Sequence, residues 1–379
     1  MNNDYLKSID GLRGLAILLV IMFHRDVAYF GWTGVILFFV LSGYLITKVL
    51  LTEKDKESFL KTKFKNFWAR RILRIFPLYY LYLFILIIVW FAKWFPGQIG
   101  TEMPYLITYS YNFYLINVYN SQGPTFLAGH LWSLAIEEQF YLIYPFLIFF
   151  CKRGHLKFLV IGLILFSIGF RLFFSFYLFG HSGDDNYQAS GNLEYHTLAY
   201  MDSFLFGAAI YIFNLDKLRP PTRYLIFIFS ILITLIGGLL IYLDLNANET
   251  FYVRKYLSNF GIEGDYTKNF YRVWGLVQLN LLFSSLLLLL VSTAKKGFQL
   301  WVKRIFELKP LVAMGKVSYG MYVFHGIVIW GLLGICNYDN RYMNKYAFFA
   351  LCLISTWLVA FVVYHIYEKR FLALKKKFR

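Results

Sequence analysis

Runs of about 20 apolar residues recur along the whole length of this 379-residue chain. A run of this length crosses the roughly 30 Å hydrocarbon core of a bilayer as an α-helix. With 59% hydrophobic and only 16% charged residues, the chain is too apolar for soluble domains of this size. The pattern therefore predicts an all-α, polytopic membrane protein. We expect ten spans, over residues 11–30, 34–52, 76–95, 131–150, 158–179, 195–213, 223–243, 272–292, 312–334 and 346–366.

The net charge of +17 is compatible with nucleic-acid binding, but the distribution of Lys and Arg favours a membrane topology. If the N-terminus is cytoplasmic, the inner segments hold 26 of these residues and the outer segments hold 6. The six outer residues are Arg25, Arg254, Lys255, Lys268, Arg341 and Lys345. We therefore predict a multi-pass protein of the inner (cytoplasmic) membrane, in contact with membrane lipids, with both termini in the cytoplasm and with no nucleic-acid partner.

No linker rich in Gly, Ser or Pro interrupts the chain, so we expect one membrane domain over residues 1–379. The opening MNNDYLKSIDGLRG lacks the features of a cleaved signal peptide, and we expect the first hydrophobic segment to stay in the protein. The three cysteines are dispersed and have no metal-binding spacing, so we assign no disulfide framework and no metal site.

Two of the more polar segments have their own patterns. Residues 52–77 mix basic side chains with apolar ones at near-helical spacing, which predicts a helix along the membrane surface. Residues 96–129 hold three prolines among many Tyr and Asn residues, which favours a loop with aromatic anchors at the outer interface.

Arg13 and His24 lie on one face of the first expected helix, because eleven positions at about 100° per residue return to nearly the same direction. An ionisable pair within a membrane span is costly and usually faces a cavity or a partner, so we consider both residues functional candidates. The alternative is that each side chain extends to the nearer membrane interface.

Glu137 and Glu138 enter the fourth expected helix within the segment GHLWSLAIEEQFYLIYP, residues 129–145. Each carboxylate is expensive in hydrocarbon unless it is paired or protonated. Ser133, Glu137 and Tyr141 follow at intervals of four residues and share a face. We predict that Glu137 or Glu138 orients His24 as a general base; the alternative is that both carboxylates hold helices together.

Arg70, Arg71 and Arg74 precede the third expected span on its cytoplasmic side. From spacing alone, a topological anchor is favoured over a site for anionic lipid or for the phosphates of a cytosolic cofactor. In the ninth expected span, Ser318, Tyr322 and His325 share one helical stripe, where His325 is either a site residue or a packed histidine. Asp202 in the sixth span is a single acid for which helix pairing is slightly favoured over a place in the cavity.

Five segments together resemble the acyltransferase-3 family of membrane-bound O-acyltransferases, and the match covers nearly the whole chain. IDGLRGLAILLVIMFH is similar to its opening motif, FFVLSGYLIT (38–47) to its second-helix signature, and RRILRIFPLYY to its Arg-rich motif. HLWSLAIEEQFYLIYP and SYGMYVFH are similar to its two later motifs. Within these segments we add Ser42 and Trp132 to the candidates for the cavity.

The resemblance implies transfer of an acyl group, commonly acetyl from acetyl-coenzyme A, to a carbohydrate hydroxyl, such as one of a cell-surface polysaccharide. It implies that Arg13 and His24 are essential, and it shifts the expectation for Arg70, Arg71 and Arg74 toward donor phosphates. His24 is then a general base or is itself acetylated, while Ser133, Tyr322 and His325 stabilise the oxyanion or position the acceptor.

Two other functions remain as alternatives. A proton-coupled transporter would use Arg13, His24, Glu137 and His325 as a relay, and a subunit of a glycan-export complex would tolerate their substitution. Some members of the family carry an additional hydrolase-like domain, whereas this chain ends soon after the last expected helix, so we expect it to act alone or with a separate partner. The acceptor, lipid-linked or free, has no signature in the sequence.

Overall fold

The computed structural model describes residues 6–94, 98–118, 125–181, 193–247, 271–293, 296–336 and 344–378, without the side chains of 177–181, 241–247, 271 and 272. Four of the outer basic residues, Arg254, Lys255, Lys268 and Arg341, lie outside the described residues. The same holds for residues 95–97 and 119–124 of the expected outer loop and for most of the loop at 180–194.

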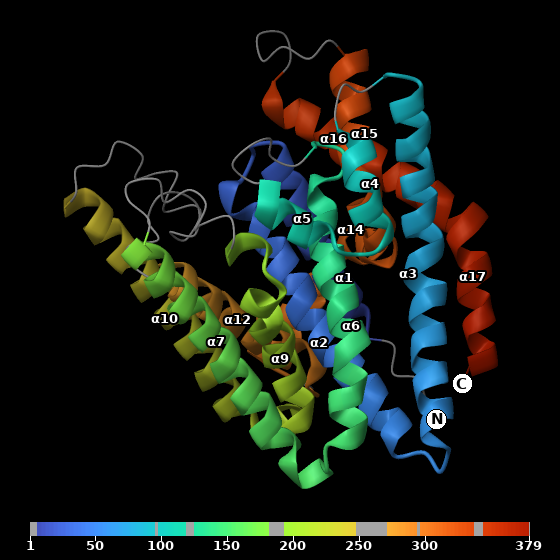
Figure 1. Ribbon diagram of the computed structural model, residues 1–379. Helices are drawn as coiled ribbons and strands as arrows, with labels where there is room; N and C mark the ends of the chain where they lie inside the picture. Colours follow the sequence, from blue (N-terminus) through green and yellow to red (C-terminus); the bar gives the residue numbers. More distant parts are fainter. Residues whose placement is uncertain are drawn as a thin grey trace. The chain divides into compact units, whose positions relative to one another are not determined.

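In these ranges every regular element is a helix and none is a strand. The longer helices, with the labels of Figure 1, are α1 (Lys7–His24), α2 (Thr33–Lys54), α3 (Leu60–Phe91), α6 (Trp132–Phe150), α7 (Leu156–His181), α9 (Thr197–Ile212), α10 (Pro220–Ala247), α12 (Tyr271–Val291), α15 (Ser318–Ile335) and α16 (Lys345–Val363). The shorter α-helices are α4 (Ile99–Ile107), α5 (Tyr111–Val118), α13 (Phe298–Phe306), α14 (Lys309–Lys316) and α17 (Lys369–Leu374).

Eight helices of the described part are long and apolar enough to cross a membrane, and they cover eight of the ten expected spans. The remaining two spans are also helical. Helix α1 carries Lys7, Asp10 and Arg13 within its 18 residues, and α9 has only 16 residues. The prediction of an all-α polytopic membrane protein is therefore confirmed. The number ten and the cytoplasmic position of both termini stay predictions.

Three boundaries differ from the expected ones. Helix α1 ends at His24 rather than near residue 30, because Asp26 adopts a left-handed conformation with φ of 54°. The ninth expected span begins at Ser318, because residues 309–316 form the separate helix α14. Residues 60–77, expected along the membrane surface, continue without a break into the third span as the 32-residue helix α3.

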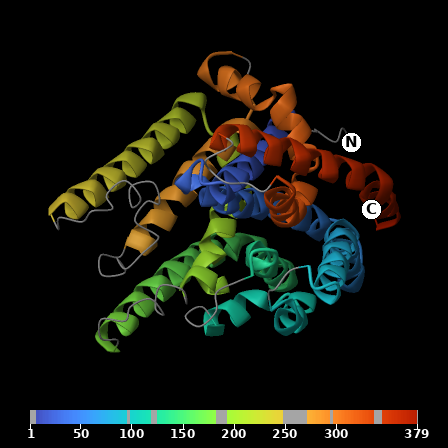
Figure 2. The ribbon, with the colours of Figure 1, turned by 90° about the horizontal axis from the view of Figure 1, so that it is seen from above.

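By their internal packing, the helices form two compact units, Met1–Lys48 with Arg153–Lys316 and Val49–Lys152 with Val317–Arg379. In the first unit α1 packs on α14, α7 on α9, and α10 on α12 (Figures 1 and 2). In the second unit α15 packs on α16, and α3 packs on α4 and on the last helical turns of the chain. A single membrane domain over residues 1–379 stays a prediction.

Two glycines allow α2 and α9 of the first unit to cross with their backbones in contact. A methyl group at Gly43 would overlap the backbone carbonyl of Phe204, and one at Gly207 would overlap that of Val40. Beside this crossing, the rings of Phe39 and Phe204 stack with their centroids 4.5 Å apart. Small residues at helix interfaces allow this close approach in membrane proteins. The second-helix motif FFVLSGYLIT therefore encodes a tight helix crossing.

Adding a methyl group at this crossing is expected to destabilise the fold. We expect Gly43→Ala and Gly207→Ala each to cost about 3 kcal/mol or more, because the obstructing atoms belong to backbone and cannot rotate away. Thermal unfolding of purified protein measures the loss. Gly162→Ala on α7 is the control, since a methyl group there meets no atom within 4 Å. Equal melting temperatures in all three variants would contradict the crossing.

Residues 99–107 and 111–118 of the outer tract are helical where a loop was expected, so the loop prediction is wrong for these residues. In α4, the side chains of Ile99, Glu102 and Leu106 are buried on one face. Tyr109 then breaks the helix with a φ of 53°, and α5 follows. The spacing of three and four residues was visible in the sequence, but prolines and aromatic residues masked it.

Candidate functional site

Arg13 and His24 lie on α1 of the first unit, as the sequence predicted. The guanidinium of Arg13 is half-buried and forms an ion pair with Asp10 one turn earlier on α1, at 2.9 Å. His24 is the last residue of the helix, and its half-buried ring makes an edge contact with Phe23 at 5.5 Å between centroids. Glu137 and Glu138 belong to the second unit, so their pairing with His24 stays a prediction.

The acidic pair of α6 meets Arg71 of α3. The Tyr141 hydroxyl donates a hydrogen bond to the Glu137 carboxylate one turn earlier, as the four-residue spacing predicted. The Arg71 guanidinium lies over the Tyr141 ring, 5.5 Å from its centroid, and interacts electrostatically with both Glu137 and Glu138. One arginine of the Arg-rich motif therefore lies close enough to the acidic pair to attract it, which partly meets the need of each carboxylate for a counter-charge.

Glu138 faces a group of tyrosines. It lies near Tyr79, Tyr109 and Tyr319, and its Oε1 is buried with no hydrogen-bond partner among the described residues. The rings of Tyr79 and Tyr109 stack at 4.3 Å between centroids. Next to Glu138, Gln139 donates to the carbonyl of Tyr109 at 2.8 Å and so fixes the strained turn between α4 and α5. Glu137 and Gln139 thus each bind a different neighbour, on either side of Glu138 in the sequence.

The other two arginines of the motif are also matched to acids. Arg70 forms an ion pair with the buried Glu53 at 3.0 Å, and its Nη1 also donates to the carbonyl of Phe378 at 3.0 Å. Arg74 interacts electrostatically with the buried Glu368, which lies in a π-helical turn over Tyr364–Glu368. Insertions of this kind in a helix are frequent at functional sites.

A second polar cluster joins α6 and α15 in the same unit. The hydroxyls of Ser133 and Tyr322 are 2.5 Å apart and share one proton in a hydrogen bond, and each also lies within hydrogen-bond distance of the carbonyl oxygen of His130, at 3.2 and 2.9 Å. The rings of His130 and His325 are 4.4 Å apart between centroids, and all four side chains are buried. We call these four residues the His–Ser–Tyr cluster. The structure thus brings together three of the predicted residues and adds His130.

Backbone carbonyls define the tautomers of both histidines. His325 Nδ1 lies 2.6 Å from the carbonyl oxygen of Tyr322, and His130 Nε2 lies 3.1 Å from that of Val323. Since a carbonyl accepts only, each of these nitrogens carries the proton. In the neutral ring the other nitrogen is then an acceptor, which is the state that a general base or a hydroxyl-positioning histidine needs.

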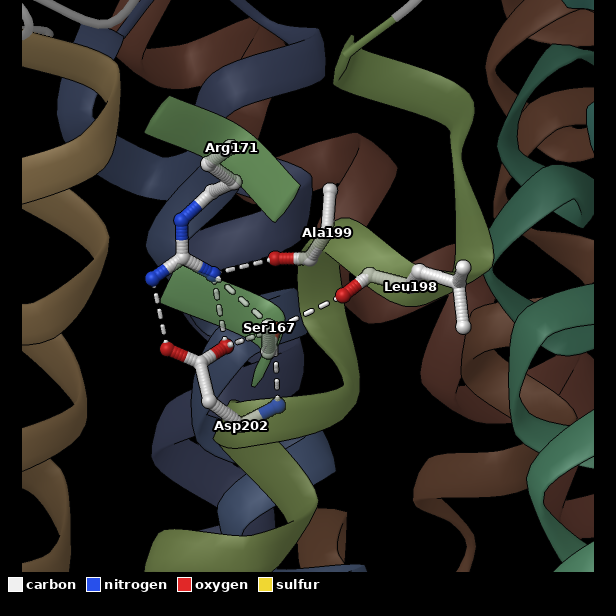
Figure 3. A network of polar contacts seen from close by, with 5 residues as sticks. All are labelled: Ser167, Arg171, Leu198, Ala199 and Asp202. Carbon is white, nitrogen blue, oxygen red and sulfur yellow. Dashed lines mark hydrogen bonds and ion pairs between the residues drawn. The ribbon is translucent and has the colours of Figure 1, made fainter. Parts of the chain in front are cut away.

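The remaining candidates have other surroundings. Asp202 forms a buried, bidentate ion pair with Arg171, at 2.8 and 2.7 Å, and the Ser167 hydroxyl donates to the same carboxylate at 3.3 Å (Figure 3). These contacts support helix pairing, the alternative favoured for Asp202, because Arg171 is on α7 and Asp202 on α9. Ser42 and Ser318 are buried, and Trp132 is half-buried at the start of α6.

Sequence reasoning missed His130, Glu53 and Arg171. His130 is inside the quoted α6 motif but outside the regular spacing that drew attention to Ser133. Glu53 looked like one of many charges in a cytoplasmic segment. Arg171 was visible as a lone cation within an apolar span, which is a signal that could have found it. Among the described residues, no three His, Cys, Asp or Glu side chains are grouped as a metal site would require.

Glu102 of α4 connects this helix to α5 and to Thr125. Its carboxylate accepts hydrogen bonds from the Tyr111 hydroxyl at 2.9 Å and from the backbone and hydroxyl of Thr125, at 3.1 and 2.6 Å. Burial raises the pKa of Glu102 above its usual value, although the hydrogen bonds from Thr125 and Tyr111 oppose this shift. The fold therefore favours the protonated carboxyl more than the unfolded chain does.

This raised pKa predicts a pH dependence of stability. A raised pKa contributes stability at acid pH, and this contribution is lost as the pH rises from the ordinary value of 4.5 through the folded-state value. Glu102→Gln, which stays neutral, is expected to lose less stability over that interval than the wild type. Melting temperatures across a pH series measure the slope. Glu57→Gln, at an exposed position, should keep the wild-type slope, and an unchanged slope in Glu102→Gln would contradict the assignment.

The fold and the buried Arg, Glu, His, Ser and Tyr side chains define a polytopic membrane protein with a polar interior, which is the kind of interior that a membrane-embedded enzyme needs. A family model described as an acyltransferase domain matches residues 6–365. The chain therefore belongs to the acyltransferase-3 family of membrane-bound acyltransferases, and the classification as an O-acyltransferase is confirmed at the level of the family.

Curated relatives carry related names. Peptidoglycan O-acetyltransferase OatA of Listeria monocytogenes is 30% identical over 347 residues, which are 86% of this chain and 50% of OatA. A Staphylococcus aureus protein provisionally named an O-acetyltransferase is 29% identical over 344 residues, 86% of this chain and 51% of the relative. YrhL of Bacillus subtilis, provisionally named a peptidoglycan O-acetyltransferase, is 35% identical over 180 residues, 45% of this chain and 26% of YrhL.

The chain spans about half the length of the first two of these relatives. No solved structure matches the chain.

Proposed function

We propose that this chain transfers an acetyl group from acetyl-coenzyme A to a hydroxyl of a cell-envelope glycan, with peptidoglycan as the first acceptor to test. The observation that carries the proposal is the His–Ser–Tyr cluster, because it gathers two imidazoles and two hydroxyls in the interior of an acyltransferase-family membrane protein. The names of the relatives support the acetyl group and the acceptor class.

The donor would bind with its phosphates near Arg70, Arg71 and Arg74. Guanidinium groups suit this task because they bind phosphate through paired hydrogen bonds. The carboxylate of Glu53 holds Arg70 in an ion pair, and Glu137, Glu138 and Glu368 attract Arg71 and Arg74 electrostatically. We infer that this arrangement prevents the arginines from forming hydrogen bonds with other acceptors. We also infer that Arg13 of α1 adds a positive charge for the donor.

In the transfer step, His24 accepts the proton of the acceptor hydroxyl while the oxygen attacks the thioester carbonyl. A C–O bond forms and the C–S bond breaks, and the imidazolium returns its proton to the departing sulfur to give coenzyme A. Hydrogen bonds from Ser133 and Tyr322 would stabilise the oxyanion, and His325 would position the acceptor. In the covalent variant, His24 is acetylated first; mass spectrometry of the quenched enzyme distinguishes the two.

The test uses the purified chain in lipid nanodiscs with acetyl-coenzyme A and soluble peptidoglycan fragments. We expect release of coenzyme A together with acetyl esters on the sugar, detected by mass spectrometry. If coenzyme A release requires a different envelope glycan, peptidoglycan is not the acceptor, while the donor and the class of acceptor are supported. If the protein forms no acetyl ester and releases no coenzyme A with any envelope glycan, the proposal is contradicted. This is the result expected of a proton-coupled transporter.

A further inference from the structure

The last described residues of the chain pack against the Arg-rich motif. The short helical turn Lys375–Phe378, which we call the lysine turn, follows α17, and both contact α3. The contact is anchored by a hydrogen bond from Arg70 Nη1 to the carbonyl of Phe378 at 3.0 Å. Arg70 and the lysine turn are 308 residues apart in sequence, so this proximity is a product of the tertiary structure.

Positive charge gathers around this contact. Lys375, Lys376 and Lys377 directly precede Phe378, and at about 2 Å of rise per residue they lie within side-chain reach of a group bound at Arg70. Lys376 and Lys377 are exposed and Lys375 is half-buried. Lys375 also interacts electrostatically with Glu368, the acid that faces Arg74. The lysine turn is thereby connected to two arginines of the motif.

The acids nearby leave this positive charge incompletely compensated. Glu53 is shared between Arg70 and Lys56, at 3.0 and 2.5 Å, and Glu368 is shared between Arg74 and Lys375. In addition, the Nη2 of Arg70 is buried and has no hydrogen-bond partner among the described residues. A buried guanidinium donor without a partner is costly, and an anionic oxygen would satisfy it.

We propose that Lys375, Lys376 and Lys377 complete, with Arg70 and Arg74, a binding site for the phosphate groups of the acyl donor's nucleotide end. This proposal rests on the proposed function, because it takes acetyl-coenzyme A as the donor. The arginines supply fixed, directional hydrogen bonds, and the lysines supply mobile point charges. Such a combination suits a ligand with several phosphates that are spread over more than one position.

Anionic lipid headgroups carry the same chemistry, and a basic segment next to a membrane also attracts them. Binding assays with the full chain in nanodiscs separate the two sources. The variant is Lys375→Gln, Lys376→Gln and Lys377→Gln combined, and the control is Lys296→Gln, Arg304→Gln and Lys309→Gln, which removes three exposed positive charges elsewhere. The probes are coenzyme A and 3′-dephospho-coenzyme A, and size-exclusion profiles check that both variants fold.

In nanodiscs of phosphatidylcholine alone, we expect the triple lysine variant to weaken coenzyme A binding about tenfold or more and the control to change it by less than about twofold. Wild type should bind the dephospho form more weakly than coenzyme A. In the triple variant, the difference in affinity between these two ligands should be smaller. If wild type binds coenzyme A and the triple variant binds it with the same affinity, this inference is overturned while the proposed function is not affected. Wild type that binds no coenzyme A refutes the donor, and with it the proposed function.

The lipid arm repeats the measurement with phosphatidylglycerol in the nanodiscs. If the triple variant loses co-purified phosphatidylglycerol but binds coenzyme A as wild type does, the lysine turn serves a lipid headgroup and the donor assignment is overturned. If the triple variant retains phosphatidylglycerol and loses coenzyme A affinity, the donor assignment is supported.

Discussion

His24→Ala is expected to lower the turnover of acetyl transfer by about 10²- to 10⁴-fold while the protein remains folded. A positioned base removes the proton of the acceptor hydroxyl as the thioester is attacked, and no neighbouring residue in α1 offers an equivalent group. The ring is at the end of α1 and only half-buried, so its removal leaves a small cavity and a small cost in stability. Steady-state release of coenzyme A with saturating acceptor measures the loss.

His155→Ala is the matched control, because His155 is exposed in a short turn and is expected to keep wild-type turnover. Adding free imidazole to His24→Ala should restore part of the activity if the residue acts as a base. Full turnover in His24→Ala would refute the mechanism. Loss of turnover together with a lower melting temperature would assign His24 a structural role instead.

Breaking the Arg171–Asp202 ion pair is expected to destabilise the first unit by about 3–5 kcal/mol. Asp202→Asn leaves the guanidinium of Arg171 buried without its counter-charge. Arg171→Met likewise leaves the carboxylate of Asp202 buried without a counter-charge. Both side chains are almost fully buried, with 1% and 0% of their area exposed. Arg171 also donates to the carbonyl of Ala199, so Arg171→Met loses a further contact with α9 (Figure 3).

The double variant Arg171→Met with Asp202→Leu should recover much of the lost stability, because removing both charges also removes the cost of burying them. Chemical unfolding of wild type, Arg171→Met, Asp202→Leu and the double variant gives the coupling energy. Arg153→Met, at an exposed position, is the control for the substitution itself. Single variants as stable as the control would show that the ion pair does not contribute to the packing of α7 on α9.

Local patterns in the sequence were reliable where the property itself is local. The length of an apolar run and its residue types decide whether a helix can cross a bilayer, and each of the ten expected spans contains a helix. The four-residue spacing of Glu137 and Tyr141 gave a true contact, and Ser318, Tyr322 and His325 are all buried on α15. The loop prediction failed at residues 99–107 and 111–118 because prolines and aromatic residues occur in short amphipathic helices as well as in loops.

The sequence by itself therefore determined the class of fold, the long apolar helices and many of the polar residues inside them. The tertiary structure decided the partners: His130 with His325, Arg70 with Glu53 and Phe378, and Arg171 with Asp202. Helical periodicity shows which side chains share a face of one helix, but it contains no information about which other helix packs on that face. That choice depends on shape, as at Gly43 and Gly207, and on the need of each buried charge for a counter-charge.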